Sequence, residues 1–116
     1  MIAVIFEVYP AEGQKDDYLD MAAKMRPLVE QIDGFISVER FQSLTDPGKL
    51  LSISVFRDEA ALDEWRRLVA HRRAQQAGRD TMFADYRLRV AHVLRDYGKF
   101  ERDEAPADSR AVHDAA

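Results

Sequence analysis

Apolar and polar residues alternate along four short runs of the chain, and two longer segments between these runs repeat apolar residues at helical spacing. The four runs predict β-strands over residues 2–9, 35–44, 50–57 and 86–96. The first run is rich in β-branched and aromatic residues and ends at Pro10, which has no N–H for a sheet ladder. A turn at residues 46–49, with Pro and Gly at its corners, joins the second and third runs and predicts a hairpin.

The two longer segments predict helices. The first covers residues 13–32, and Asp33-Gly34 after it supplies a left-handed stop. Pro27 lies inside this segment and is expected to kink the helix, because an interior proline removes a hydrogen bond. The second covers residues 58–78, with a bend, and starts with an aspartate, which is a preferred N-cap residue.

The order of these elements, β-α-β-β-α-β, predicts the fold class. In so short a chain it favours an α+β, ferredoxin-like arrangement, an antiparallel sheet with both helices on one face. We therefore predict one domain over residues 1–98. Residues 99–116 are charged and alanine-rich with few large apolar side chains, so we expect a C-terminal tail that cannot offset its own ordering entropy but could dock on a partner subunit.

Alternation assigns the strand side chains to two faces of the predicted sheet. We expect the more apolar set of each strand to face the helices, away from water. These sets are Ile2, Val4, Phe6 and Val8; Ile36 and Val38; Leu51, Ile53 and Val55; and Leu88, Val90 and Leu94. The opposite face mixes large apolar residues with Glu7, Glu39, Arg87 and Arg89. Such a face favours a homodimer in which a second copy covers it, and an exposed amphipathic sheet on a monomer is the alternative.

Composition narrows the range of functions. The formal net charge of -4 argues against general nucleic-acid binding. The chain has no cysteine, which excludes disulfides, thiol catalysis and iron–sulfur clusters and fits a reducing cytoplasm. The apolar start has no basic lead-in and is interrupted by Glu7, so no membrane span is expected. The histidines lack metal-ligand spacing and no glycine motif cradles a phosphate, so we expect neither a metal nor a nucleotide.

The stretch over residues 32–78, taken with MIAVIFEVYP before it and DYRLRVAHVLRDYG after it, resembles the antibiotic biosynthesis monooxygenase family. The most specific features are the Gly34-Phe35 strand entry, the Pro47-Gly48 hairpin, and the helix from Trp65 through His71 to Gln75. The resemblance covers about residues 1–98. It implies a dimeric α+β barrel in which two subunits pack sheet against sheet. The family includes cofactor-independent oxygenases of aromatic polyketides, quinol oxygenases, haem-degrading oxygenases and proteins without an established reaction.

Two histidines are candidate catalytic bases. His71 and Gln75 lie one helical turn apart, so a ligand could meet an imidazole and an amide together. With an ordinary pKa of about 6.5, His71 suits proton removal from a phenol or quinol, and an ion-paired surface histidine is the alternative. His92 falls in the apolar set of the last strand, so it is expected to point toward the helices, where a hydrogen-bonded core histidine is the alternative.

Three aromatic residues are candidate substrate contacts. Trp65 has the spacing of a core residue, but a bend in its helix would bring its indole to a pocket as a stacking surface. Tyr86 begins the set that holds His92 and could orient a substrate oxygen. In the haem-degrading and polyketide branches, an asparagine takes part in the site, and its first-strand position corresponds here to Phe6 or Glu7. This chain has no asparagine, which argues against the usual haem-degrading constellation and makes Phe6 the candidate contact at that position.

We expect a cofactor-independent monooxygenase that holds a small phenolic or quinol-like molecule between the sheet and the helices. Deprotonation by His71 or His92 would make an electron-rich anion that itself reduces oxygen, inside a pocket that excludes water. Two alternatives stay open. One is a non-catalytic dimer that binds a small hydrophobic ligand or has a structural role, and the other is a haem-binding or haem-degrading protein.

Overall fold

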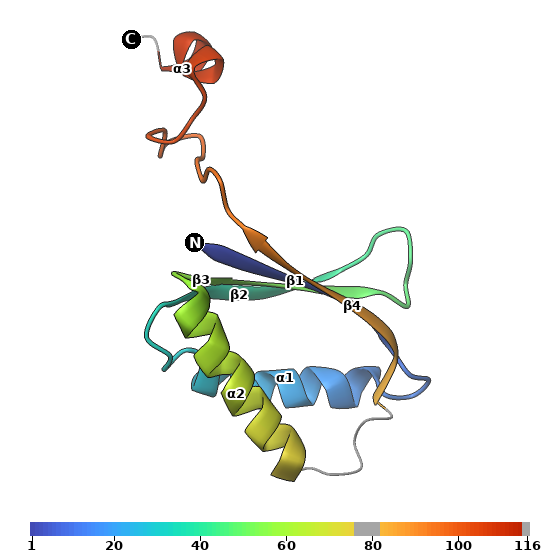
Figure 1. Ribbon diagram of the computed structural model, residues 1–116. Coiled ribbons are helices and arrows are strands. Elements are labelled where there is room, and N and C mark those ends of the chain that lie inside the picture. The colour runs from blue at the N-terminus through green and yellow to red at the C-terminus, as the bar shows by residue number, and fades with distance from the viewer. Residues whose placement is uncertain (76–81, 115–116) are drawn as a thin grey trace.

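A computed structural model describes residues 1–75 and 82–114, and for residues 71–75 it describes the backbone alone. Its elements, in chain order, are β1 (Ile2–Pro10), α1 (Lys15–Val29), β2 (Phe35–Gln42), β3 (Leu50–Phe56), α2 (Glu59–Gln75), β4 (Phe83–His92) and α3 (Ala107–His113). The four strands form one sheet in the order β2-β3-β1-β4, and every neighbouring pair is antiparallel. Both long helices lie on one face of this sheet (Figure 1). The predicted ferredoxin-like α+β fold is therefore confirmed.

The register of β1 against β3 decides which side chains lie under the helices. Ile2 pairs with Phe56, and Val8 pairs with Leu50. Directly paired residues of antiparallel strands point to the same side of a sheet, and all four of these side chains are buried. The same register brings Ser52 opposite Phe6 and Ser54 opposite Val4, so both serines also lie on the helix side.

Three parts of the predicted face assignment are wrong. Leu51, Ile53 and Val55 lie on the open face of β3, because the pairing with β1 turns the less apolar set of this strand toward the helices. In β2, a register shift between Phe35 and Ser37 turns Phe35 into the core and leaves Ile36 48% exposed. Leu94 lies beyond the end of β4 and is 82% exposed. The assignments for β1, for Val38, and for Leu88 and Val90 agree with the pairing.

The buried core consists of two separate clusters under the two ends of the sheet. One contains Ile2, Val4, Val29, Ile32, Phe56, Ala61 and Leu62, where the end of α1 meets the start of α2. The other contains Val8, Tyr18, Leu50 and Met82, near the start of α1. Between them the sheet presents the small, polar side chains of Ser52 and Ser54, which cannot fill the space beneath the helices. The core is therefore interrupted in the middle of the sheet.

The junction between α1 and β2 is bound to the start of α2. The predicted left-handed stop is confirmed at Gly34, whose φ is +92°. The Arg57 N–H donates to the Gly34 carbonyl over 2.7 Å, and the Arg57 guanidinium reaches Asp33 at 3.3 Å and Asp58 at 3.1 Å. Asp58 caps α2, because its carboxylate accepts the Ala61 N–H at 2.9 Å. That backbone N–H, and then Arg57, hold the pKa of Asp58 below its ordinary value.

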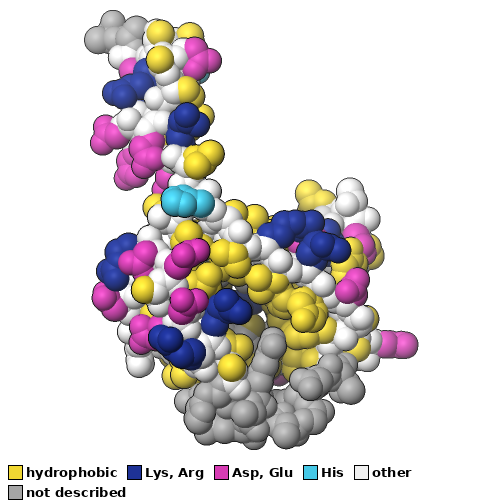
Figure 2. All heavy atoms as spheres, viewed as in Figure 1, with side chains coloured by type: hydrophobic (Ala, Val, Ile, Leu, Met, Phe, Trp, Pro, Cys, Tyr) yellow, Lys and Arg dark blue, Asp and Glu magenta, His cyan; other side chains and the backbone are white. Residues whose placement is uncertain are grey.

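The segment after β4 forms an arm that leaves the body of the molecule (Figure 1). Its far end holds α3, a short helix with no buried residue. Arg102 holds the arm together through its contacts with Asp114 at 2.9 Å, Ser109 at 2.7 Å and the Gly98 carbonyl at 3.0 Å. Charged side chains of both signs cover it (Figure 2). The radius of gyration of 17.2 Å exceeds the value of about 13 Å for a compact chain of this length, which reflects the projecting arm.

No helix in the described part of the chain is both long enough and apolar enough to cross a membrane.

Replacement of Gly34 by alanine is expected to lower the free energy of unfolding by about 1–3 kcal/mol. The backbone there is left-handed, and an added Cβ would lie 2.9 Å from the Ala61 Cβ. Gly13→Ala is the matched control, since Gly13 also has a positive φ but no atom within 4 Å of an added Cβ. Urea denaturation should rank Gly34→Ala as less stable than Gly13→Ala, and equal losses would contradict the role assigned to the contact with α2.

Candidate functional site

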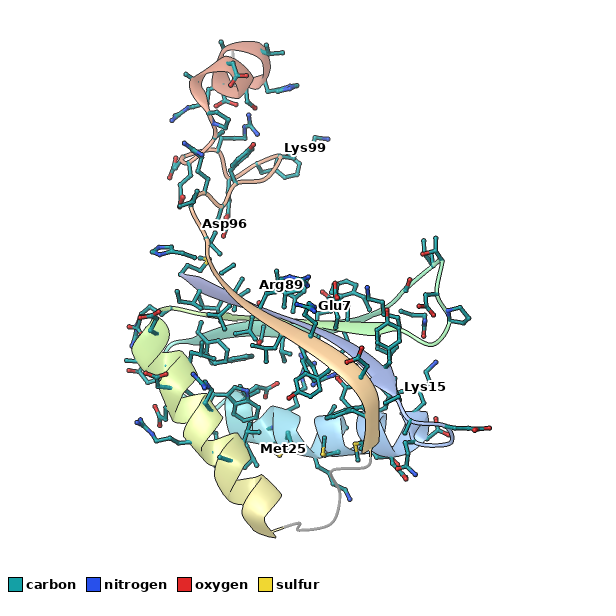
Figure 3. The ribbon with its side chains drawn as sticks, turned by 45° about the vertical axis from the view of Figure 1, so that its right-hand side comes forward. Glu7, Lys15, Met25, Arg89, Asp96 and Lys99 are labelled. Atoms are coloured by element: carbon teal, nitrogen blue, oxygen red, sulfur yellow. The ribbon has the colours of Figure 1, made fainter. Side chains whose placement is uncertain are left out.

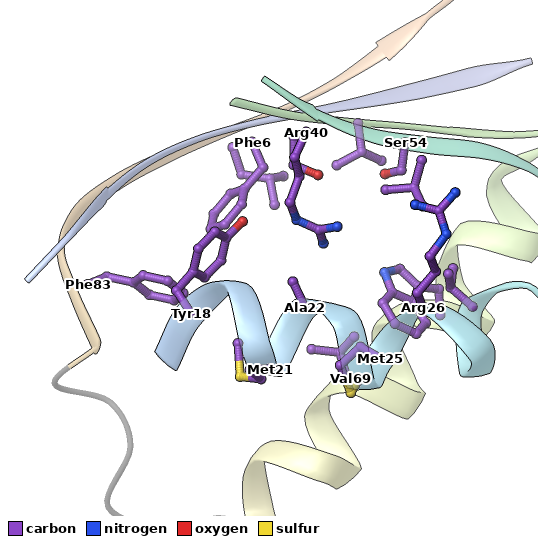
Figure 4. Close-up of a pocket in the computed structure, with 16 residues that line it drawn as sticks. Phe6, Tyr18, Met21, Ala22, Met25, Arg26, Arg40, Ser54, Val69 and Phe83 are labelled. Atoms are coloured by element: carbon purple, nitrogen blue, oxygen red, sulfur yellow. The ribbon is translucent and has the colours of Figure 1, made fainter. Parts of the chain in front are cut away.

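A cavity of about 210 Å³ occupies the gap between the two core clusters, beneath the helix side of the sheet (Figure 4). Its floor comes from all four strands, and its far wall comes from α1, with Trp65 and Val69 of α2 closing one side. Apolar side chains gather on the face of the molecule between the sheet and the helices (Figure 2). The cavity is thus the place where the small polar residues of β3 leave room for a ligand.

The α1 wall is apolar because one stripe of the helix faces the sheet. The stripe carries Tyr18, Met21, Ala22, Met25 and Val29, at the spacing of one helical face. Tyr18 is 3% exposed, and its ring lies 5.6 Å from the ring of Phe83. Phe6 lies 5.8 Å from Phe83 in an edge-to-face arrangement. These aromatic rings form a rigid end wall suited to a flat apolar ligand.

The polar groups of the cavity come mainly from β2 and β3, the two strands whose buried faces the sequence predicted least well. Arg40 of β2 pairs with Ser52 of β3, and Val38 pairs with Ser54, so one cation and two hydroxyls share the cavity floor. Ser52 is 7% exposed. Arg26 lines the opposite edge, but its Nε is 3.0 Å from a Glu30 carboxylate oxygen. An apolar chamber with a few convergent polar groups is the usual form of a small-molecule site.

Of the six residues proposed from the sequence, two line the cavity, two lie outside it, and two have side chains outside the described residues. Phe6 and Trp65 line the cavity. Tyr86 and His92 belong to the helix side of β4, an edge strand whose Phe83 and Leu88 line the cavity. Tyr86 is 57% exposed with its ring 5.7 Å from that of Phe6, while His92 is exposed opposite Ile2. Neither of them lines the cavity.

The other two proposed residues, His71 and Gln75, lie in the last turns of α2, and their side chains fall outside the described residues.

Sequence reasoning missed Arg40, Tyr18 and the two serines. Arg40 stands two residues after Val38, in the same alternating phase, so a strand that points Val38 at the helices also points Arg40 there. The sequence therefore contained the signal that places Arg40 on the helix side of the sheet. The serines carried no such signal, because their side depends on pairing with β1. Among the described residues, no group of three or more His, Cys, Asp or Glu side chains is placed to hold a metal ion.

A four-stranded antiparallel sheet with two helices on one face defines a domain of the ferredoxin-like class, and the apolar cavity between sheet and helices has the form of a small-molecule site. Comparison with protein families makes the assignment specific. The model for antibiotic biosynthesis monooxygenase matches residues 1–77, and the chain belongs to that family. The resemblance seen in the sequence is thereby confirmed.

The relatives differ in how much of their own length this chain covers. A protein of Pyricularia oryzae named jasmonate monooxygenase ABM is 48% identical over 93 residues, which cover 80% of this chain and 43% of that protein. The chain therefore spans less than half the length of this relative. The structure of Rv0793 from Mycobacterium tuberculosis has a TM-score of 0.71 at 21% identity, covering 84% of this chain and 98% of that one.

A third similar structure is a mutant of SnoaB, a cofactor-independent oxygenase from Streptomyces nogalater. Its TM-score is 0.65 at 10% identity, covering 82% of this chain and 94% of that one. At such identities the two solved structures show a shared fold.

Replacement of Ala22 by leucine is expected to weaken binding of naphthol, a neutral aromatic probe, by about tenfold. Ala22 is 5% exposed and lines the cavity, so the added carbons occupy the ligand's space. Ala23→Leu is the control, because Ala23 is exposed on the same helix. Isothermal titration calorimetry of both variants measures the effect, and equal affinities would show that the probe binds elsewhere.

Proposed function

We propose that this protein is a monooxygenase that oxidises a small phenolic or quinol-like substrate inside the cavity, without a metal or an organic cofactor. The observation that carries the proposal is the apolar chamber with aromatic walls, in a chain that belongs to a monooxygenase family. Phe6 and Trp65 would hold the aromatic ring, and Tyr86 would lie beside Phe6 at the open edge of β4. Support for independence from cofactors comes from SnoaB, which is described as a cofactor-independent oxygenase.

The proposed reaction draws all of its electrons from the substrate. Removal of a proton makes an anion, which gives one electron to O₂, and recombination of the two radicals forms a C–O bond. The resulting peroxide loses water, so one oxygen atom stays on the substrate and the other leaves as water. The protein's part is to bind, to accept the proton and to exclude water from the radical pair. Of the two histidines that the sequence suggests, we assign the proton acceptor to His71 of α2, because His92 is exposed and does not line the cavity.

A second candidate substrate comes from the relative at 48% identity, which is named for jasmonate. Jasmonate is the anion of a small carboxylic acid with an apolar ring, and it matches the apolar walls of the cavity equally well. The two candidates differ in charge, because jasmonate carries a carboxylate whereas a phenol or quinol is uncharged near neutral pH. They are distinguished by direct comparison in one assay.

We also propose that two copies of the chain pack through the open face of the sheet. This face holds Ile5, Leu51, Ile53 and Val55 around Glu7. Glu7 lies 3.4 Å from Arg89 (Figure 3). Lys49 lies 3.5 Å from the same carboxylate, so the charge of Glu7 is already balanced. Because three apolar residues of β3 lie here rather than under the helices, the face is more apolar than the sequence indicated. Burial of about 800 Å² on each copy would make an interface of ordinary size.

The oxygenase proposal predicts oxygen uptake with dihydroxynaphthalenes, quinols or jasmonate in a buffer treated to remove metals. Under ¹⁸O₂, one labelled atom should enter the product. The His71→Ala/His92→Ala double variant should lose at least about 100-fold in rate, the size of a general-base contribution. Uptake no faster than the uncatalysed reaction for every substrate would favour a non-catalytic binding protein. Uptake unchanged in the double variant would remove both histidines as the base.

The dimer proposal predicts that Ile53→Glu gives a monomer in sedimentation velocity at micromolar concentration. Ile53 pairs with Ile5 in the middle of the open face, so a new carboxylate there would be buried without a partner. Leu44→Glu is the control, since Leu44 is 100% exposed in the loop between β2 and β3. A wild-type protein that sediments as a monomer would contradict the proposal.

A further inference from the structure

Arg40 projects from the sheet into the cavity with its guanidinium group above α1. The close-up shows this side chain descending from β2 toward Ala22, between Phe6 on one side and Ser54 on the other (Figure 4). Its neighbour across the β2–β3 pair is Ser52, which also lines the cavity. A permanently charged group therefore stands among walls that are mostly apolar.

No carboxylate within the described part of the chain forms an ion pair with Arg40. Its Nε–H is buried and has no hydrogen-bond partner among the described residues. Arg26 offers the contrast within the same cavity, since its Nε is paired with Glu30 at 3.0 Å and its side chain is 53% exposed. A cation in an apolar site is costly unless a partner compensates it, so an unpaired one marks a position for an anionic group.

We propose that Arg40, with the hydroxyl groups of Ser52 and Ser54, forms the binding site for the carboxylate of a small apolar acid. The planar guanidinium presents parallel N–H donors that match the two oxygens of a carboxylate. The serine hydroxyls supply further donors on the same floor, and the rings of Phe6 and Tyr18 contact the apolar remainder. The ligand thus lies with its charged end at β2 and β3 and its apolar end toward the aromatic wall.

The overall charge of the protein does not supply this selectivity. The formal net charge is -4, so long-range electrostatic repulsion disfavours an anionic ligand. Recognition of a carboxylate must then come from local contacts with Arg40. The inference rests on the proposed function only in treating the bound acid as the substrate, because binding is measured here without turnover.

The test compares phenylbutyrate with its uncharged methyl ester, which has the same apolar body. Trp65 is the only tryptophan of the chain and lines the cavity, so quenching of its fluorescence reports binding, with calorimetry as a second measurement. The wild-type protein should bind the acid about 30-fold or more tightly than the ester. Arg40→Met should lose this preference while it binds the ester as well as wild type does. Arg26→Met is the matched control and should keep the preference, because Glu30 already neutralises Arg26.

The thermal stability of the variants separates ligand recognition from a structural role. Removal of an unpaired charge should leave the Tm of unliganded Arg40→Met unchanged or raised, and Arg40→Lys should keep part of the preference for the acid. A wild-type protein that binds the ester as tightly as the acid would overturn the proposal. So would an Arg40→Met protein with a lowered Tm that binds neither ligand. Selective binding of phenylbutyrate, together with no oxygen uptake above the uncatalysed rate for any substrate of the oxygenase assay, would refute the oxygenase proposal and leave this site standing.

Discussion

The pairing of β1 with β3 is the constraint on which the rest of this structure depends. At its two ends it brings large apolar residues together under the helices, Ile2 with Phe56 and Val8 with Leu50. In the middle it puts Ser54 and Ser52 beside Val4 and Phe6. The apolar core therefore forms as two clusters with a gap between them, and the gap is the cavity. One register produces both the stability and the candidate site.

The same register also makes the open face of the sheet apolar. Because Ser52 and Ser54 point to the helices, their neighbours Leu51, Ile53 and Val55 point the other way. A domain of this size buries only about two-thirds of the surface that its unfolded chain exposes, so a partner on this face would add substantially to the buried area. The proposed dimer and the proposed ligand site thus follow from two sides of one strand.

The candidate chemistry depends on a single charge in apolar surroundings. The walls from α1 and the aromatic rings are apolar, and in a medium of low dielectric a cation such as Arg40 interacts strongly with any anionic group that enters. Such a cation can orient an acid and can also stabilise a negative charge that develops on it. The proposed carboxylate site would therefore contribute positioning and charge stabilisation.

The sequence by itself determined the element order, the ferredoxin-like fold, the stop at Gly34, the cap at Asp58 and the family, because each depends on local pattern or on short motifs. It also named Phe6 and Trp65, which line the cavity. Only the tertiary structure decided which face of β3 is buried, because strand register is set by a partner far away in the chain and not by the apolar content of the strand itself. For the same reason it alone revealed the two serines beneath the helices, whereas the side of Arg40 follows from its phase with Val38, and it alone showed that His92 at the edge strand β4 is exposed.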